Sequence, residues 1–399
     1  LNWESDGQLI KSKRFGNPAL RNQKYYFQEN VSWSYLGGGN LTLRYYPEGG
    51  LFDSVGPSFF SIHRDNLFEV LGILNSAVGS YLTTISPTLA FTPGQLLATP
   101  YRRLSKEVLD LVIKAINISR EEWDCKEGSW DFSRSSLLKQ KGYDVEESYN
   151  LLIQYWKNKF FLLHSIEEKI NIEIIKSYGL DDELSSQVPL SDLSILREES
   201  SVENGKLIFD AVEVFAQFVS YSVGCMFGRY SLDKESLILA NQGESLRDYL
   251  AIIGKSDREV SFLPDDDNII PVLDDEWFED DIVGRFHEFL KASFGEKNFR
   301  KNLDFVEECL GKNMRKYFTK DFYKDHIKRY KKRPIYWMFS SPKGHFNVLV
   351  YLHRYTPDII STILNSYLRE FIEKLNLQMK QLKQVEISGS ASEQAKARK

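Results

Sequence analysis

The chain has 399 residues, of which 42% are hydrophobic, and this composition excludes a disordered protein. Its length is sufficient for two or three domains, each with its own core. The formal net charge of −5 excludes a globally positive field that would recruit nucleic acid, so any surface that binds polyanions must be local.

The cysteines and the composition of the chain indicate a reducing compartment. Cys125, Cys225 and Cys309 form no Cys-x-x-Cys pair, which argues against a zinc module or a disulfide framework. The first residue is Leu1, and no basic and then apolar leader follows it, so we expect no signal peptide. No uncharged apolar run approaches the ~20 residues of a membrane span. We therefore expect a cytoplasmic chain without a membrane partner.

Short apolar segments separated by turn residues characterise the first hundred residues. Residues 24–62 alternate between apolar and polar side chains and contain glycine turns, which predicts short antiparallel strands. Residues 66–84 have helical spacing, and residues 89–100 predict a second hairpin. We therefore predict a β-hairpin-rich mixed α/β domain over residues 1–105.

Helical periodicity dominates the next hundred residues. Residues 103–117 predict one helix, and residues 144–178 predict a long amphipathic helix with Gly179 at its C-terminal cap. The polar stretch 181–204 predicts a loop or an insertion. Residues 106–204 are therefore expected to form a helical spacer with a polar insertion.

The segment 205–350 combines an apolar helix, an acidic loop and a basic helix, which predicts a second α+β segment. Residues 209–221 are apolar and helical in spacing, whereas residues 257–281 are acidic. Within the acidic stretch, the run Asp265-Asp266-Asp267 is expected to be a solvated loop rather than a metal site, because no EF-hand spacing follows it.

The last segment, residues 351–399, is expected to contain an amphipathic helix over residues 357–380 and then a polar tail. The predicted fold class of the chain is therefore mixed α/β (α+β), with a hairpin-rich domain and long amphipathic helices.

A block of positive charge stands out between residues 312 and 333, where ten Lys or Arg and two Asp give a net charge of +8. Six lysines recur there at a spacing of four: Lys312, Lys316, Lys320, Lys324, Lys328 and Lys332. On a helix each step of four drifts by about 40°, so the lysines form a slowly winding ridge. Like charges at this spacing repel by a few tenths of a kcal/mol per pair, and a polyanion would relieve that repulsion. A solvated helix face, partly neutralised by Asp321 and Asp325, explains the pattern equally well.

The candidate DNA-binding residues come from this block and from one early strand. Those in the block are Lys316, Lys320, Lys324, Lys328, Arg329, Lys331 and Lys332. The other candidate is Arg44, which follows the glycine turn 37–39 on a predicted strand and is suited to reading a guanine edge or holding a phosphate. Arg44 as a plain surface residue of that strand is the alternative. The glycine turn lacks the Lys-Ser/Thr of a P-loop, so a hairpin turn is favoured there.

No catalytic, cofactor-binding or metal-binding constellation is recognisable in the sequence. Its six histidines show no metal spacing. Adenine methyltransferases extrude the target base and hold its amine with an Asn/Asp-Pro-Pro-Tyr/Phe loop. The one Asn-Pro of this chain, Asn17-Pro18, is followed by Ala19. We therefore expect the chain neither to bind S-adenosylmethionine nor to methylate DNA alone.

Four stretches together resemble the adenine-specific DNA methyltransferases of BREX phage-defence systems, the PglX family. They are residues 122–132 around Trp123 and Trp130, residues 222–232 (Ser-Val-Gly-Cys-Met-Phe-Gly-Arg-Tyr-Ser-Leu), residues 274–286, and residues 330–344 (Tyr-Lys-Lys-Arg-Pro-Ile-Tyr-Trp-Met-Phe-Ser-Ser-Pro-Lys-Gly). No stretch is a catalytic motif, but their order is specific. The resemblance covers residues 20 to 375, and the early part is also similar to target-recognition domains of restriction-modification enzymes.

The resemblance implies a role for the chain within a larger enzyme. The parent would transfer a methyl group from S-adenosylmethionine to adenine at a specific site in double-stranded DNA. The chain would supply the C-terminal target-recognition and spacer parts, with the upstream methyltransferase domain as its partner. The alternative is a protein-interaction scaffold that docks other BREX proteins through the helix at 357–380.

Overall fold

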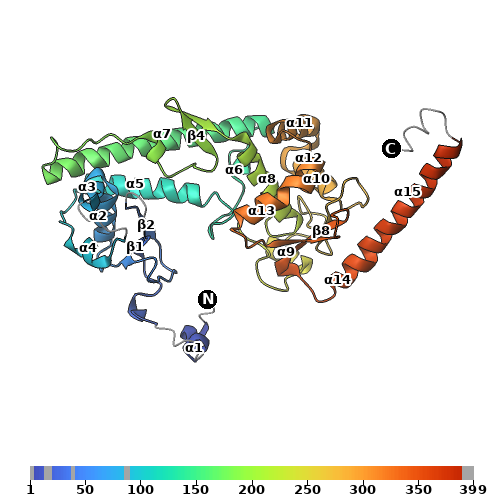
Figure 1. Cartoon of the computed structure of the whole chain (residues 1–399), viewed down its shortest axis with the longest axis horizontal. Coiled ribbons are helices and arrows are strands. Elements are labelled where there is room, and N and C mark those ends of the chain that lie inside the picture. The colour runs from blue at the N-terminus through green and yellow to red at the C-terminus, as the bar shows by residue number, and fades with distance from the viewer. Residues whose placement is uncertain (1–3, 13–19, 37–40, 85–89, 389–399) are drawn as a thin grey trace. The chain divides into compact units, whose positions relative to one another are not determined.

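The computed structural model describes residues 4–12, 20–36, 41–84 and 90–388 (Figure 1). The chain forms two compact units: unit 1 comprises Leu1–Ser119 and Lys159–Leu193, and unit 2 comprises Arg120–Asn158 and Ser194–Lys399. The units interleave along the sequence because α5 (Lys106–Trp123) and α7 (Val145–Tyr178) contribute residues to both. Helices dominate and the strands form small antiparallel sheets, which confirms the predicted α+β class.

Unit 1 is built on a three-stranded antiparallel sheet of order β2-β1-β3, in which Val31 pairs with both Tyr45 and Phe59. Besides parts of α5 and α7, its elements are α1 (Glu4–Ser12), η1 (Gln23–Tyr25), β1 (Asn30–Trp33), β2 (Leu43–Tyr46), β3 (Ser58–Phe59), α2 (Arg64–Asn75), α3 (Ala77–Thr84), α4 (Pro93–Ala98) and η2 (Leu190–Asp192). The sheet confirms the short antiparallel strands predicted over residues 24–62, although the glycine turn 37–39 lies outside the described residues.

Helix α2 covers one face of this sheet, because it packs on β1 and β2. Leu43 is fully buried, and the Tyr45 ring lies 5.6 Å from that of Phe68 on α2. Asn75 fixes the end of α2 to the sheet: its Oδ1 accepts from the backbone N–H of Leu43 at 2.8 Å, and its Nδ2 donates to the Leu43 carbonyl at 3.0 Å. Side chains alternate along a strand, so Arg44 lies on the face of the sheet opposite Leu43 and Tyr45.

One helix prediction and one hairpin prediction in unit 1 need correction. The helix predicted over residues 66–84 is two helices, because Ser76 is extended (φ −81°, ψ 172°) and ends α2. The hairpin predicted over residues 89–100 is wrong, because residues 93–98 form α4. Its start is a capping box in which Thr92 and Gln95 satisfy each other's backbone, with Pro93 in the first turn.

The long helix α7 confirms its prediction almost to the residue. Its apolar face is buried over its whole length, from Leu152 to Ile174. Gly179 ends the helix in the left-handed conformation, with φ of +70°, and the N–H of Leu180 donates to the Ile175 carbonyl at 3.1 Å. This pattern of bonds is a Schellman C-cap, for which glycine is the preferred residue.

Unit 2 contains a β-hairpin, a second small sheet and most of the remaining helices. Besides parts of α5 and α7, its elements are α6 (Ser136–Lys139), β4 (Ser200–Glu203), β5 (Lys206–Phe209), α8 (Ala211–Met226), α9 (Leu246–Ile253), β6 (Ile269–Pro271), α10 (Ile282–Phe294), η3 (Glu296–Asn298), α11 (Phe299–Leu310), α12 (Met314–Tyr317), η4 (Phe318–Phe322), α13 (Tyr323–Arg329), β7 (Tyr336–Ser340), β8 (Asn347–Tyr351), η5 (Leu352–Arg354), α14 (Ile359–Thr362), η6 (Ile363–Leu368) and α15 (Arg369–Ser388). The loop predicted over residues 181–204 is mostly irregular, but its end forms β4. Asn204 and Gly205 both have positive φ and join β4 to β5, as type I′ hairpin turns require.

The core of unit 2 has two parts. Helix α8 packs against α10 and α11 through aromatic rings, such as Phe218 and Phe289 at 5.6 Å. The sheet of order β6-β8-β7 packs its apolar side chains against α14, η6 and the start of α15. Ile359, Ile363 and Phe371 of these helices are buried in this second part of the core. The predicted C-terminal helix is therefore present, and it continues to Ser388. Among the helices of the described ranges, none is long and apolar enough to cross a membrane.

A close approach inside unit 2 requires glycine at position 224 on α8. A Cβ atom built there would lie 2.4 Å from the Tyr230 ring and 3.2 Å from the Tyr336 hydroxyl. Both rings are buried, and Gly224, Tyr230 and Tyr336 all lie in stretches that carry the family resemblance. The sequence therefore places a glycine where these two rings meet the backbone of α8.

Replacing Gly224 with Ala should destabilise the chain by about 1–3 kcal/mol, because the added methyl group overpacks the Tyr230 ring. The matched control is Gly284→Ala on α10, where the nearest atom would be a backbone oxygen at 3.9 Å. The control should be neutral or stabilising by up to about 1 kcal/mol, as for alanine in place of helical glycine. Urea unfolding measures both, and equal stability of the two variants would contradict the packing argument.

Candidate nucleic-acid interface

The basic block folds as one continuous helical segment made of α12, η4 and α13. Four lysines are exposed on its outer side, and we call them the lysine face: Lys316, Lys320, Lys324 and Lys328. The inner side is apolar and aromatic, with Met314, Tyr317, Phe318, Phe322 and His326 buried. The aromatic residues that interleave with the lysines therefore anchor the segment to the core.

A π-helical turn, η4, interrupts the segment between α12 and α13. A π turn holds more residues than the 3.6 of an α turn. It therefore offsets locally the drift of about 40° that a spacing of four accumulates on an α-helix. The winding ridge predicted from the spacing is straightened at this point, which keeps the lysine face on one side of the segment.

The two ends of the six-lysine series differ from the lysine face. Lys312 binds Asp321 at 2.6 Å and is half-buried. Lys332, with Lys331, lies exposed in the turn that ends α13, where both residues have positive φ (64° and 50°). The N–H of Lys332 closes this turn by donating to the Ile327 carbonyl at 2.8 Å. Lys331 and Lys332 thus extend the positive surface beyond the helix.

Two of the three arginines of the block, Arg315 and Arg329, point inward, which the sequence did not predict, whereas Arg333 is exposed. Arg315, at the start of the segment, donates from Nη1 to Asp281 Oδ2 at 2.6 Å and to the carbonyls of Leu273 and Asp275. The Asp281 side chain is 1% exposed, and its Oδ1 also caps α10. Burial raises the pKa of Asp281, whereas the hydrogen bond and charge of Arg315 oppose that rise. Arg315 therefore joins the basic segment to α10.

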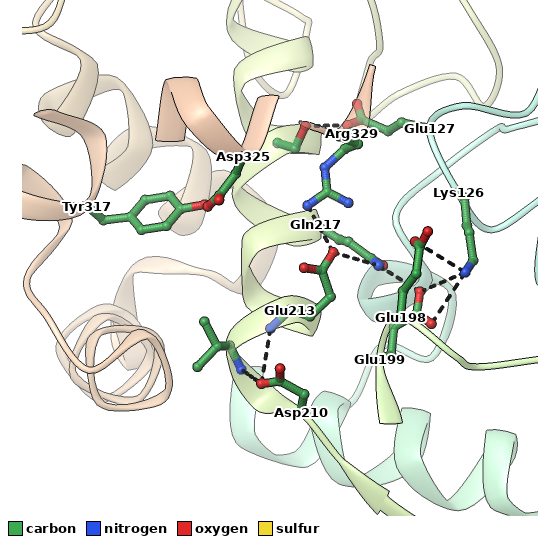
Figure 2. A network of polar contacts seen from close by, with 12 residues as sticks. Lys126, Glu127, Glu198, Glu199, Asp210, Glu213, Gln217, Tyr317, Asp325 and Arg329 are labelled. Carbon is green, nitrogen blue, oxygen red and sulfur yellow. Dashed lines mark hydrogen bonds and ion pairs between the residues drawn. The ribbon is translucent and has the colours of Figure 1, made fainter. Parts of the chain in front are cut away.

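Arg329, at the end of the segment, also forms an inward ion pair, as Arg315 does at its start. Its Nη2 lies 3.1 Å from Glu213 Oε1 on α8, and its side chain is 13% exposed. Figure 2 shows the guanidinium between Glu213 and Glu127. Gln217 continues the network by donating to Glu213 at 3.3 Å and to Glu199 at 2.7 Å. The sequence predicts Arg329 to be a DNA-binding residue, whereas in the structure its charged atoms are directed into the protein, toward Glu213.

Lys126 holds the far end of the same network. Its Nζ lies 2.9 Å from Glu122, 3.4 Å from Glu198 and 3.4 Å from Glu199, as Figure 2 shows for the last two. Glu127, the next residue, is buried and accepts a hydrogen bond from Ser220 on α8. Burial raises the pKa of Glu127, and the Ser220 hydrogen bond and the Arg329 charge oppose that rise. The stretch 122–132 is thereby tied to α8 and α13.

Three of the four stretches that carry the family resemblance, 122–132, 222–232 and 330–344, meet at a buried cluster of polar rings. Arg229 donates to the hydroxyl of Tyr230 at 3.1 Å and to that of Tyr351 at 3.0 Å. His326 stacks on Tyr336 with ring centroids 4.7 Å apart. The Nε2 atom of His326 accepts from the backbone N–H groups of residues 335 and 336, and burial lowers the pKa of this imidazole to about 3. His326 is therefore a neutral structural acceptor.

Arg44, the remaining candidate, belongs to unit 1. It is exposed on the edge strand β2, and its Nη1 donates to the Leu43 carbonyl at 3.1 Å. Burial raises the pKa of Glu167 on α7 to about 7, and the positive charge of Arg44 opposes that rise. Arg44 is therefore within electrostatic reach of α7, and it is not part of the lysine face.

A cluster of three aspartates outside these networks consists of residues of a type that can bind metal ions. Carboxylate oxygens of Asp265, Asp267 and Asp280 lie within 4.8 Å of one another. The Tyr367 hydroxyl lies 2.8 Å from Asp267 and 2.7 Å from Asp280. Asp265 is buried, so the expected fully solvated loop is wrong at this residue, and burial raises its pKa to about 8. The backbone N–H of Ile269 donates to Asp265 Oδ1 at 3.1 Å and to Asp267 Oδ1 at 3.0 Å, so these carboxylates hold the start of β6.

Comparison with known proteins places the chain among methyltransferase relatives. No family model matches it. It is 36% identical over 388 residues to the adenine-specific methyltransferase BrxX of Escherichia coli O9:H4 (strain HS), which covers 92% of this chain and 32% of that protein. It is 34% identical over 409 residues to the adenine-specific methyltransferase PglX of Lacticaseibacillus casei (strain Zhang), at 97% and 32% coverage. The chain spans about a third of the length of these relatives, and the predicted resemblance to PglX-like proteins is confirmed.

Replacing Arg329 with Met should destabilise the chain by about 2–3 kcal/mol, because it leaves the Glu213 carboxylate largely buried without its cation. The double variant Arg329→Met/Glu213→Met should recover most of this loss, since it removes both charges. The control is Arg300→Met, which breaks the exposed pair of Arg300 with Asp304 and should cost less than about 1 kcal/mol. Urea unfolding of the four proteins decides: a loss at Arg329 no larger than at Arg300 would show that the inner pair does not hold the segment.

Proposed function

We propose that this chain is the DNA-binding, target-recognition part of a site-specific adenine DNA methyltransferase in a BREX phage-defence system. The relatives are named adenine-specific methyltransferases, and the chain accounts for about a third of their length. In this proposal the rest of the parent binds S-adenosylmethionine and transfers the methyl group, and the chain positions that part on double-stranded DNA. The observation that carries the proposal is the lysine face on a segment whose arginines are held inside.

The lysine face has the charge and the extent that a duplex backbone requires. From Lys316 to Lys328 the segment rises roughly 18 Å, since a helix rises about 1.5 Å per residue. That length of B-DNA carries about ten phosphates, at one charge per 1.7 Å or so. Lysines bind phosphates as flexible point charges and contribute affinity with little sequence preference. In a chain of net charge −5, this surface supplies the local positive field that binding needs.

Sequence preference would then come from another surface, and Arg44 is our candidate. It lies exposed on the edge strand β2 of unit 1, the part similar to target-recognition domains. Arginine pairs with the O6 and N7 atoms of guanine through two hydrogen bonds, which contribute about 1–3 kcal/mol of discrimination. The electrostatic reach of Arg44 to Glu167 supports a structural role as the alternative.

A second function, docking of other defence proteins, is favoured by the C-terminal helix. Apolar side chains of α15 are exposed beyond the core: Ile372, Leu375, Met379 and Leu382. Such a row on one helix is typical of a protein-interaction surface. The two functions respond differently to salt, because phosphate contacts weaken steeply as salt rises and apolar contacts do not.

Replacing all four residues of the lysine face with Ala should weaken binding to random and specific duplexes alike. The slope of log affinity against log salt should become shallower by roughly 3–4, at about 0.9 for each phosphate that the variant no longer neutralises. The control removes the same charge from exposed lysines elsewhere in unit 2, Lys206, Lys297, Lys380 and Lys383, and should leave the slope nearly unchanged. Fluorescence anisotropy at several salt concentrations measures these slopes. Equal slopes for the two variants would contradict DNA contact and favour the alternative, that the lysine face is a solvated helix surface.

Arg44→Ala in the full-length parent should relax methylation at one position of the recognised site, with little change in affinity for random duplex. Arg44→Lys keeps the charge but loses the paired donors of the guanidinium. If Arg44 reads a base, both variants should relax the site; a phosphate contact would survive in the Lys variant. Methylation mapping by sequencing is the measurement, and an unchanged site in both variants would make Arg44 a phosphate contact or a structural residue.

A further inference from the structure

A small cavity lies inside unit 2, next to the network of Figure 2. Its volume is about 40 Å³, and α8, α13 and the stretch after α5 contribute to its wall. Most of the wall is apolar, with Phe132, Leu152 and Trp156 among its residues. Its polar part consists of Glu122, Cys125, Glu127, Ser135, Ser136, Glu199, Gln217 and Arg329. The cavity therefore adjoins the groups that attach α13 to α8.

Two charged side chains in this wall have a buried atom without a hydrogen-bond partner. One is Oε1 of Glu127, whose Oε2 accepts from Ser220. The other is Nε of Arg329, whose Nη2 binds Glu213. Leaving a buried charged group with an unmet hydrogen bond costs several kcal/mol, so such atoms are nearly always satisfied in folded proteins. One atom is an acceptor and the other is a donor.

The size and chemistry of the cavity select its occupant. A single water needs roughly 10–15 Å³ of such space, so there is room for about three or four waters. Organic ligands occupy pockets of about 300–1,000 Å³, which excludes a nucleoside cofactor here. The carboxylates in the wall do not converge as a cation site requires: the group of described residues whose ligand atoms do converge is Asp265, Asp267 and Asp280. Water is both donor and acceptor, which matches the two unmet atoms.

We propose that this cavity is a hydration site, in which ordered water accepts a hydrogen bond from Arg329 Nε and donates one to Glu127 Oε1. The water links Glu127 of the stretch 122–132 to Arg329 of α13, beside the direct contacts that both side chains make with α8. It acts as a structural ligand of the joint that holds the lysine-bearing segment. This inference does not depend on whether the chain binds DNA.

Crystals of the chain under xenon pressure test the site directly. Polar cavities hold ordered water, whereas dry apolar cavities bind xenon. We expect water density within hydrogen-bond distance of Glu127 Oε1 and no xenon in the cavity. Xenon in the cavity, a metal ion there, or an empty cavity would each overturn the proposal.

Two variants of Glu127 give a second test in solution. Glu127→Gln keeps the shape and the hydrogen-bonding capacity toward water, whereas Glu127→Met keeps the length and removes that capacity. We expect the melting temperature to fall clearly further for Glu127→Met, and water to remain in the cavity of Glu127→Gln. Equal melting temperatures would contradict a bound water. The crystals of the unchanged chain decide the matter if Glu127→Met does not fold.

Discussion

Two ion pairs between buried or half-buried groups, Arg315 with Asp281 and Arg329 with Glu213, hold the basic segment in place. If either partner of such a pair is removed, the other is left as an uncompensated charge inside the protein, which is energetically costly. Each pair therefore holds its two elements together. The pairs lie near the two ends of the segment, one to α10 and one to α8. The lysine face between them is therefore presented on a fixed support, although four like charges on one side repel each other.

The same constraint explains why the stretches resembling PglX lie where they do. None of them is a catalytic motif, and three of them meet around Glu127, Arg229 and Tyr336 in the interior of unit 2. The close approach at Gly224 and the stacking of His326 on Tyr336 belong to this cluster. These stretches thus form a buried polar framework within unit 2. This framework supports the segment that bears the exposed residues of the lysine face.

The sequence predicted much of the fold and part of the site, with clear physical limits. Regular periodicity over many turns located α7 and the basic segment, and Gly179 marked a helix end. Residues 93–98 were misread because the Thr-Pro-Gly-Gln start of α4 has the composition of a turn. Charge counting grouped Arg329 with the lysines, since it ignores direction; the preference of arginine for buried ion pairs was the available signal. The π turn η4 has no recognisable sequence signature, so the straightened lysine face appeared only in three dimensions.

We propose that DNA contacts the lysine face, which the inward arginines leave exposed. Chemical footprinting of lysines tests it most directly: the chain is acetylated with and without duplex DNA, and each lysine is quantified by mass spectrometry. We expect DNA to protect Lys316, Lys320, Lys324 and Lys328, while exposed Lys206 and Lys297 keep their reactivity. Equal reactivity of the lysine face with and without bound DNA would contradict it.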